Sequence, residues 1–190
     1  LNVANSAIKN AGEKVAKEVP PLKSVSFEEI TKVKPFEFPK YVMADEDKLS
    51  EKNGYKKLDI ICDIVESESP VSEEWLMKRI VFLFGREKVT NVVRDEFNYI
   101  LRNCSKYKIV RKKGFLYSQG KEIPMLRVPQ GNTPVREIKY ISLEELSLGM
   151  KEVIKQNISI EKNSLFRYIY QQLGFSRMGK DNIERLEKAL

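Results

Sequence analysis

The sequence predicts a mainly helical protein with a small β-hairpin, in which one structural unit occurs twice. Residues 58–101 align without a gap to residues 147–190, at a constant offset of 89 positions. Apolar residues recur at helical spacing in both copies, and Gly85 and Gly174 interrupt them at equivalent places. After the first copy, alternating residues flank a Gly-containing turn, which is typical of a β-hairpin. These observations predict two similar domains in tandem.

Residues 1–54 are predicted to form an N-terminal helix followed by an extended linker. The helical spacing of apolar residues stops at Pro20-Pro21, and the linker that follows carries Phe36 and Phe38. An alternative to a free linker is that these two aromatic side chains pack along a neighbouring domain, because exposed aromatic groups are costly.

The first unit, residues 55–122, is predicted to begin with two helices. A helix over 58–67 is followed by a short extended piece at Pro70-Val71. Ser72 then caps a second helix, which ends at Gly85 because glycine tolerates the left-handed backbone that closes a helix.

A third helix and a hairpin are predicted to complete this unit. Thr90 caps a helix over 91–102, and alternating residues over 107–111 and 115–117 flank the turn at 112–114. Three helices, a strand after the first and a hairpin after the third form the winged-helix variant of the helix-turn-helix motif. We therefore expect tandem winged-helix domains, mainly α with a small β-hairpin wing.

The second unit, residues 142–190, is predicted to repeat the three helices after a linker over 123–141. Ser142 and Glu145 form a capping-box pattern at the start of a helix over 143–156. The remaining expected elements are an extended piece over 158–160 and helices over 161–172 and 180–190. The sequence ends before a second hairpin, so we expect the wing of this unit to be absent or truncated.

Composition excludes several kinds of site. The chain has no His, which excludes His-dependent triads and His-containing zinc sites, and Cys62 and Cys104 cannot supply a four-Cys site. We expect two buried free thiols, with a single disulfide as the alternative. No phosphate-binding glycine loop is present. We therefore predict no enzymatic activity for this chain, no cofactor and no metal.

Neither a secretion signal nor a membrane span is visible in the sequence. The first residues lack the apolar core of a signal peptide, and no apolar run approaches the length of roughly 18 residues that a span requires. A cytoplasmic location is therefore expected, with no membrane partner.

The net charge of +7 is concentrated in one segment. Residues 102–121 contain seven basic residues and no acidic one, so phosphate contacts through a basic wing are expected. The third helix adds Asn and Arg side chains, which suit adenine and guanine edges. The candidate nucleic-acid-binding residues are Asn91, Arg94, Asn98, Arg102, Lys106, Lys108, Arg111, Lys112 and Lys113. A solvated basic hairpin without a ligand is the alternative, and the charge-balanced helix over 180–190 is not expected to read bases.

Several motifs in combination resemble a known family over residues 55–190. They are the stretch 64–74 with Gly85 and Val89-Thr90, and the pieces 114–117, 124–129, 141–145 and 173–177. The family that they resemble is an uncharacterised C-terminal domain family of large bacterial superfamily I helicase-like ATPases.

This resemblance implies that the chain is the tail of a helicase-type protein whose ATPase motifs lie upstream of Leu1. The non-Met start fits a processed product or a piece of a longer protein. The expected function is a C-terminal nucleic-acid-binding accessory module. Its expected partners are DNA or RNA, bound without sequence specificity, and the upstream helicase or ATPase domain of the same polypeptide. The alternative is a protein–protein interaction module that docks on the parent ATPase or on a partner.

Overall fold

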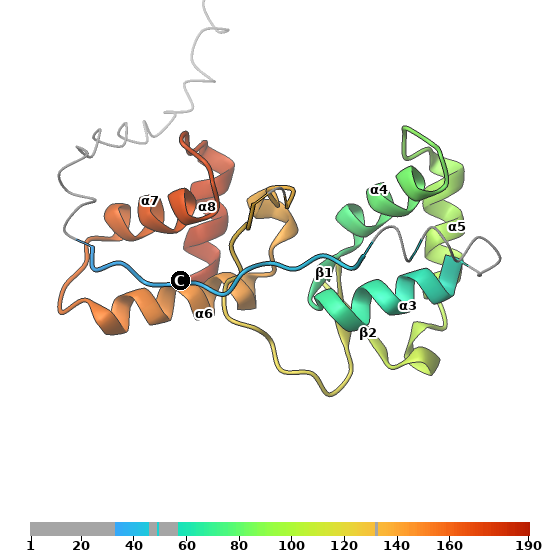
Figure 1. The fold of residues 1–190 in the computed structure, drawn as a ribbon, viewed down its shortest axis with the longest axis horizontal. Helices are drawn as coiled ribbons and strands as arrows, with labels where there is room; N and C mark the ends of the chain where they lie inside the picture. The colour runs from blue at the N-terminus through green and yellow to red at the C-terminus, as the bar shows by residue number, and fades with distance from the viewer. Residues whose placement is uncertain (1–32, 46–48, 50–56, 132) are drawn as a thin grey trace, which may run out of the picture.

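The computed structural model describes residues 33–45, 49, 57–131 and 133–190 (Figure 1). These residues form six α-helices and one three-stranded antiparallel sheet, which agrees with the predicted mainly helical fold with a small β-hairpin. The helix expected within residues 1–19 lies outside the described residues. None of the described helices is long and apolar enough to cross a membrane.

The first unit contains the predicted three helices, the short strand and the hairpin. The helices are α3 (Lys57–Glu68), α4 (Glu73–Leu83) and α5 (Asn91–Leu101), and the strands are β1 (Val71–Ser72), β2 (Ile109–Lys112) and β3 (Phe115–Ser118). The strand order is β1-β3-β2, so β1 extends the hairpin on its β3 side. A 3₁₀ turn, η1 (Cys104–Tyr107), joins α5 to β2.

The local signals in the first unit act as expected. The side chains of Ser72 and Thr90 accept hydrogen bonds from the backbone N–H groups of Trp75 and Val93, which caps α4 and α5. Lys112 pairs with Phe115 across the hairpin. Lys113 and Gly114 form its turn with positive φ angles of 49° and 77°, the combination that a tight two-residue hairpin favours.

The core of the first unit joins all three helices to the sheet. Ile61, Ile64, Leu76, Leu101 and Leu116 are at most 1% exposed and belong to one hydrophobic cluster. Cys62 and Cys104 are both free thiols, as predicted, but the predicted burial holds only for Cys104, because Cys62 is partly exposed.

The second unit repeats the helices of the first. Its helices are α6 (Leu143–Gln156), α7 (Lys162–Gln172) and α8 (Lys180–Ala189), and a 3₁₀ turn, η2 (Ile138–Tyr140), precedes them. At the offset of 89, α4 and α7 coincide residue for residue. Gly85 and Gly174 both adopt positive φ, 68° and 88°, so the turn that closes the helix is repeated as well. The helices predicted for the second copy are therefore present at the corresponding positions, whereas the described residues after Ser118 contain no strand.

The stretch over 123–141, expected to be a linker, is instead packed into the core of the second unit. Leu126, Val128 and Ile138 are buried there with the apolar residues of α6, α7 and α8. Isolated apolar residues in an irregular segment carry no periodicity, so the sequence did not reveal their burial.

Residues 33–45, which we call the strap, run in an extended conformation along both units (Figure 1). The backbone of the strap pairs with Val128, whose N–H donates to Pro39 O at 2.9 Å and whose carbonyl accepts from Tyr41 N at 2.8 Å. Phe38 is 2% exposed and lies in the core of the second unit with its ring 6.5 Å from that of Tyr168. The alternative that these aromatic residues pack on a domain surface is confirmed.

The replacement Gly149→Ala should destabilise the second unit. A Cβ at Gly149 would lie 2.4 Å from Leu126 Cβ, which is fixed to its own backbone and cannot rotate away. Overpacking costs typically about 1–3 kcal/mol, and the higher helix propensity of alanine recovers up to about 1 kcal/mol, so we expect a net loss in urea unfolding. Ser147→Ala on the same helix is the control, with stability unchanged or slightly raised. Equal stability of Gly149→Ala and the wild type would contradict the close approach.

Candidate nucleic-acid interface

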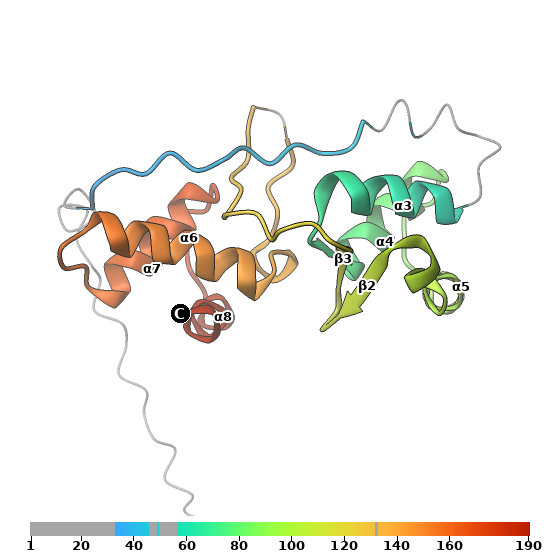
Figure 2. The same ribbon diagram turned by 90° about the horizontal axis from the view of Figure 1, so that it is seen from below.

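Most of the candidate binding residues lie on one exposed surface of the first unit. Helix α5 buries Val93, Phe97 and Leu101 against the core and turns its polar residues outward. Figure 2 shows that α5, the β2–β3 hairpin and α8 all lie on the side of the molecule opposite the strap. The exposed candidates are Asn91, Arg94, Arg102, Lys106, Lys108, Arg111, Lys112 and Lys113.

Arg111 is held by partners inside the protein. Its guanidinium makes two parallel hydrogen bonds to Glu73, Nε to Oε1 at 2.8 Å and Nη2 to Oε2 at 2.7 Å. Asn98 Oδ1 accepts a third bond from Nη2 at 2.8 Å. These bonds fix the hairpin to α4 and α5, and Glu73 compensates the charge of Arg111. Arg111 and Asn98 are therefore less available to a ligand than their residue types suggested.

Lys112 is also neutralised, by a residue of the second unit. Its Nζ lies 3.1 Å from Oε1 of Glu144 on α6, and Tyr117 donates from its hydroxyl to Oε2 of the same carboxylate at 3.2 Å. Burial, and then the negative charge of Glu144, raise the pKa of Tyr117 to about 12. The hairpin thus docks on α6 instead of projecting freely.

The other basic candidates have no carboxylate partner among the described residues. Arg94, Lys106 and Lys108 form no ion pair with any residue that the structure describes, and the guanidinium of Arg102 lies 5.6 Å from the ring centre of Tyr99. Of the two acidic residues on α5, Glu96 is compensated by Lys57 at 2.5 Å. The surface of α5 and η1 therefore keeps an excess of positive charge that a polyanion can neutralise.

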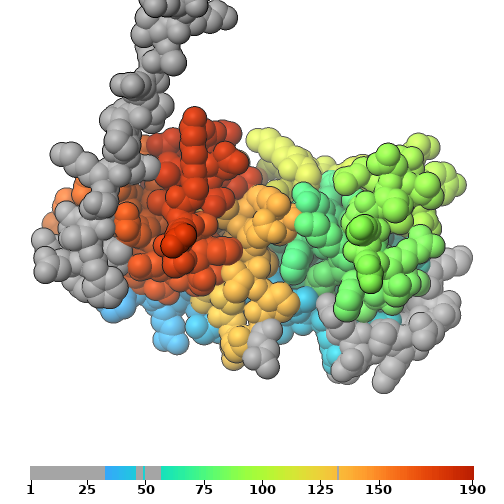
Figure 3. Space-filling view, turned by 90° about the horizontal axis from the view of Figure 1, so that it is seen from above, coloured from blue at the N-terminus to red at the C-terminus, as the bar shows by residue number. Residues whose placement is uncertain are grey.

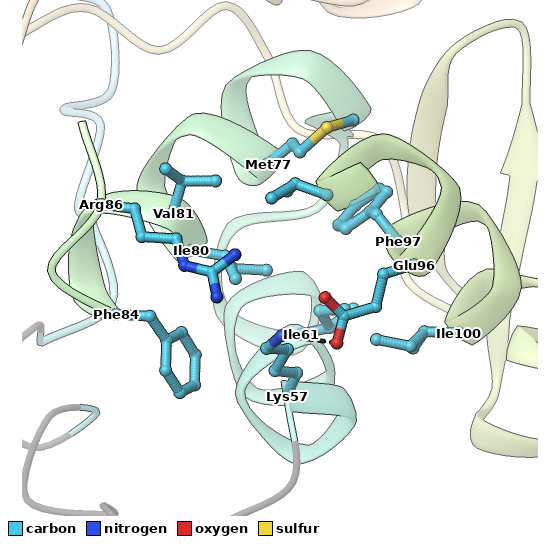
Figure 4. A pocket seen from close by; sticks show the side chains of 11 residues that line it. Lys57, Ile61, Met77, Ile80, Val81, Phe84, Arg86, Glu96, Phe97 and Ile100 are labelled. Carbon is cyan, nitrogen blue, oxygen red and sulfur yellow. Dashed lines mark hydrogen bonds and ion pairs between the residues drawn. The ribbon is translucent and has the colours of Figure 1, made fainter. Parts of the chain in front are cut away.

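A small apolar pocket lies behind α5, between α3 and α4 (Figure 4). Ile61, Ile80 and Phe97 line it, as do the ion-paired side chains of Lys57 and Glu96. Its volume is about 130 Å³, and two of its polar lining groups, Lys57 and Glu96, are bound to each other. This pocket can hold a small apolar group.

A buried ionic cluster, which the sequence did not reveal, joins the segment before η2 to α6. The Glu145 side chain is fully buried and accepts bonds from Arg127 Nη2 at 3.0 Å and Arg136 Nη2 at 2.7 Å. Burial alone would raise the pKa of the Glu145 carboxyl, but the charges of Arg136 and Arg127 lower it. Of the two hydrogen bonds in the predicted capping box, one is present: Glu145 N–H donates to Ser142 Oγ at 3.1 Å. The Glu145 carboxylate, which would accept the other, binds the two arginines instead.

A second buried carboxylate, Glu68 at the end of α3, connects the first unit to the strap. It accepts bonds from Arg79 Nη1 at 2.6 Å, from Ala44 N at 2.7 Å and from the hydroxyl of Tyr41. Arg127 Nη1 donates to the backbone carbonyl of Glu68 at 2.9 Å and so joins this group to the Glu145 cluster. The two carboxylates therefore help to hold both units and the strap together.

The units also meet through Tyr140 of η2. Its ring centre lies 5.5 Å from that of Trp75, and its hydroxyl donates to Glu74 at 3.0 Å and accepts from Lys78 at 2.6 Å. Figure 3 shows this yellow-orange segment between the helices of the two units.

No family model, curated protein or solved structure matches the chain.

Proposed function

We propose that the chain is a nucleic-acid-binding accessory module and that its first unit is a winged helix. The order α3-β1-α4-α5-β2-β3, with strand order β1-β3-β2, supports the winged-helix assignment. In such domains the third helix is the one that enters the major groove and the hairpin lies against the backbone beside it. The corresponding helix here is α5.

One observation carries the proposal: the exposed basic residues of α5 and η1 have no carboxylate partner in the part of the chain that the structure describes. Arg94, Lys106 and Lys108 are exposed and, among the described residues, unpaired, as are Arg102 at the end of α5 and Lys113 at the hairpin turn. Release of counterions from phosphates gives such a surface affinity for DNA or RNA of any sequence. The association with a helicase-like ATPase is part of the proposal and is supported by the motif resemblance alone.

A double variant tests this surface. Lys106→Ala/Lys108→Ala should weaken binding to a blunt DNA duplex roughly tenfold and reduce the slope of log K against log salt by about two, one for each phosphate that is no longer neutralised. Fluorescence anisotropy at several salt concentrations measures both quantities.

The matched control for this experiment is Lys155→Ala/Lys162→Ala. It removes the same charge, but from lysines of the second unit that are already paired with Glu152 and Glu187. Its duplex affinity should stay near that of the wild type. The proposal fails if the wild-type chain does not bind duplex at low salt, or if both double variants bind equally well.

A protein-interaction module is the second candidate, and a specific observation favours it. Val92 and Tyr99 lie seven positions apart on α5 and are 75% and 69% exposed. Such apolar groups on a helix surface suit a protein partner. If the duplex experiment fails, the replacements Val92→Ser and Tyr99→Ser should abolish capture of the parent ATPase by the immobilised chain.

A further inference from the structure

We propose that the molecule has a second nucleic-acid contact, a groove between the hairpin and the second unit that binds a single-stranded segment. The inference rests on the proposed nucleic-acid-binding function and adds to it a site to which both units contribute. The groove has a volume of about 420 Å³. Its walls come from the hairpin (Lys113, Phe115, Tyr117), α6 (Leu143, Glu144, Ser147, Leu148, Lys151) and α8 (Arg185, Lys188, Ala189), with Ile123 beside them.

The rim of the groove is cationic. Lys113, Lys151, Arg185 and Lys188 line it with a single carboxylate, Glu144, which Lys112 already compensates. None of the three rim lysines forms an ion pair with a described residue. The groove therefore keeps a local excess of positive charge, although α8 as a sequence is charge-balanced.

The Arg185 guanidinium is held in place at this rim by backbone carbonyl groups. Its Nε donates to the carbonyl of Ile138 at 2.8 Å and its Nη2 to that of Ile141, and its guanidinium lies 5.8 Å from the ring centre of Phe115. Carbonyl oxygens orient a guanidinium without cancelling its charge. Arg185 thus connects the hairpin to η2 while it remains a cation in the wall of the groove.

The apolar part of the groove favours a single strand over a duplex. Leu148 is 36% exposed, and Phe115, Ile123 and Leu143 continue the apolar surface between the cationic groups. Unstacked bases bind apolar and aromatic surfaces while their phosphates bind Lys and Arg, which is the common arrangement in single-strand binding sites. The bases of a duplex are stacked inside the helix and cannot reach such a surface.

The position of the groove connects it to the proposed duplex surface. Figure 2 shows the hairpin between α5 and α8 on one side of the molecule, and Lys113 at its turn lines the groove. A strand that leaves a duplex bound at α5 therefore meets Lys113 at the turn of the hairpin and then the cationic groups of α6 and α8 that line the groove. This continuity favours a nucleic acid over an acidic peptide as the occupant.

Two groove variants test the inference with labelled oligothymidylate of about 15 nucleotides, within the usual site size. Lys151→Ala/Lys188→Ala should weaken oligothymidylate binding roughly tenfold and reduce its salt slope by about 1.4, because two phosphates of the single strand are no longer neutralised. Leu148→Ser should weaken binding without changing the salt slope, since it removes only a base contact. Circular dichroism checks that both variants fold, and Lys155→Ala/Lys162→Ala is again the charge-matched control.

The duplex measurements separate this inference from the proposed function. The affinity of Lys151→Ala/Lys188→Ala for a blunt duplex should stay within about twofold of the wild-type value, because the residues proposed to contact duplex phosphates lie on α5 and η1 and are unchanged. If the wild type binds oligothymidylate through the groove but does not bind duplex, the groove stands and the duplex surface fails. Unchanged oligothymidylate binding in the groove variants would overturn the inference that the groove binds a single strand. Polyglutamate that competes as well as unlabelled oligothymidylate would also overturn it, because it would indicate a site for acidic peptides.

Discussion

Replacing Glu145 with alanine should cost about 3–5 kcal/mol of folding free energy, the usual penalty for breaking a buried ion pair by removing one partner. The Glu145 side chain is fully buried, and it is the carboxylate that binds both Arg127 and Arg136. Without it, two guanidinium groups remain in a buried site. Both guanidinium groups also lie close to the ring of Tyr41, that of Arg127 at 5.2 Å and that of Arg136 at 3.8 Å from its centre, so their like charges would stay near each other. Urea unfolding measures the loss.

The control lies on the same helix. Glu152 pairs with Lys155 at the surface, where such pairs contribute at most about 1 kcal/mol, so Glu152→Ala should change stability little. Comparable losses in the two variants would mean that the Glu145 cluster does not stabilise the fold. If Glu145→Ala destabilises the protein as expected, replacing Arg136 with methionine in that variant should recover part of the lost free energy of unfolding, because it removes one uncompensated charge.

Acidification should remove the same stabilisation in the unmodified protein. The folded-state pKa of Glu145 is lowered from its ordinary value of 4.5, because the attraction of Arg136 and Arg127 exceeds the opposing effect of burial. The unfolded chain therefore takes up the proton first as the pH falls. The contribution of Glu145 is fully present above the unfolded-state value and is lost as the pH falls through the folded-state pKa.

The variant Glu145→Gln isolates this effect from the other carboxylates. At neutral pH it should be clearly less stable than the wild type, and the difference between the two proteins should shrink as the pH falls below about 4.5. Urea midpoints measured from neutral to acidic pH test this. Parallel stability curves over the whole range would show that Glu145 does not titrate differently in the folded and unfolded states.

Most of the secondary structure could be inferred from the residues alone. Ser72, Thr90 and Ser142 cap the helices that they were expected to cap, and Gly85 and Gly174 close equivalent helices. The hairpin also forms as expected. These features depend on groups within a few positions of one another, where spacing and side-chain type decide the geometry.

The candidate site was only partly inferable, because the partners of its charges lie far away along the chain. Arg111 is paired with Glu73, 38 positions away, and Lys112 with Glu144, 32 positions away. A count of basic residues cannot distinguish these compensated groups from Lys106 and Lys108.

The arrangement of the two units likewise comes from tertiary contacts. Burial makes long-range partners necessary, since an isolated charge in the interior is costly and must find its counter-ion. Glu68 and Glu145 meet arginines from other elements, and Arg185 meets the carbonyls of η2. Local spacing thus specified the helices, the caps, the hairpin and the repeat. The fold alone decided which cations stay exposed, because that depends on carboxylates distant in sequence.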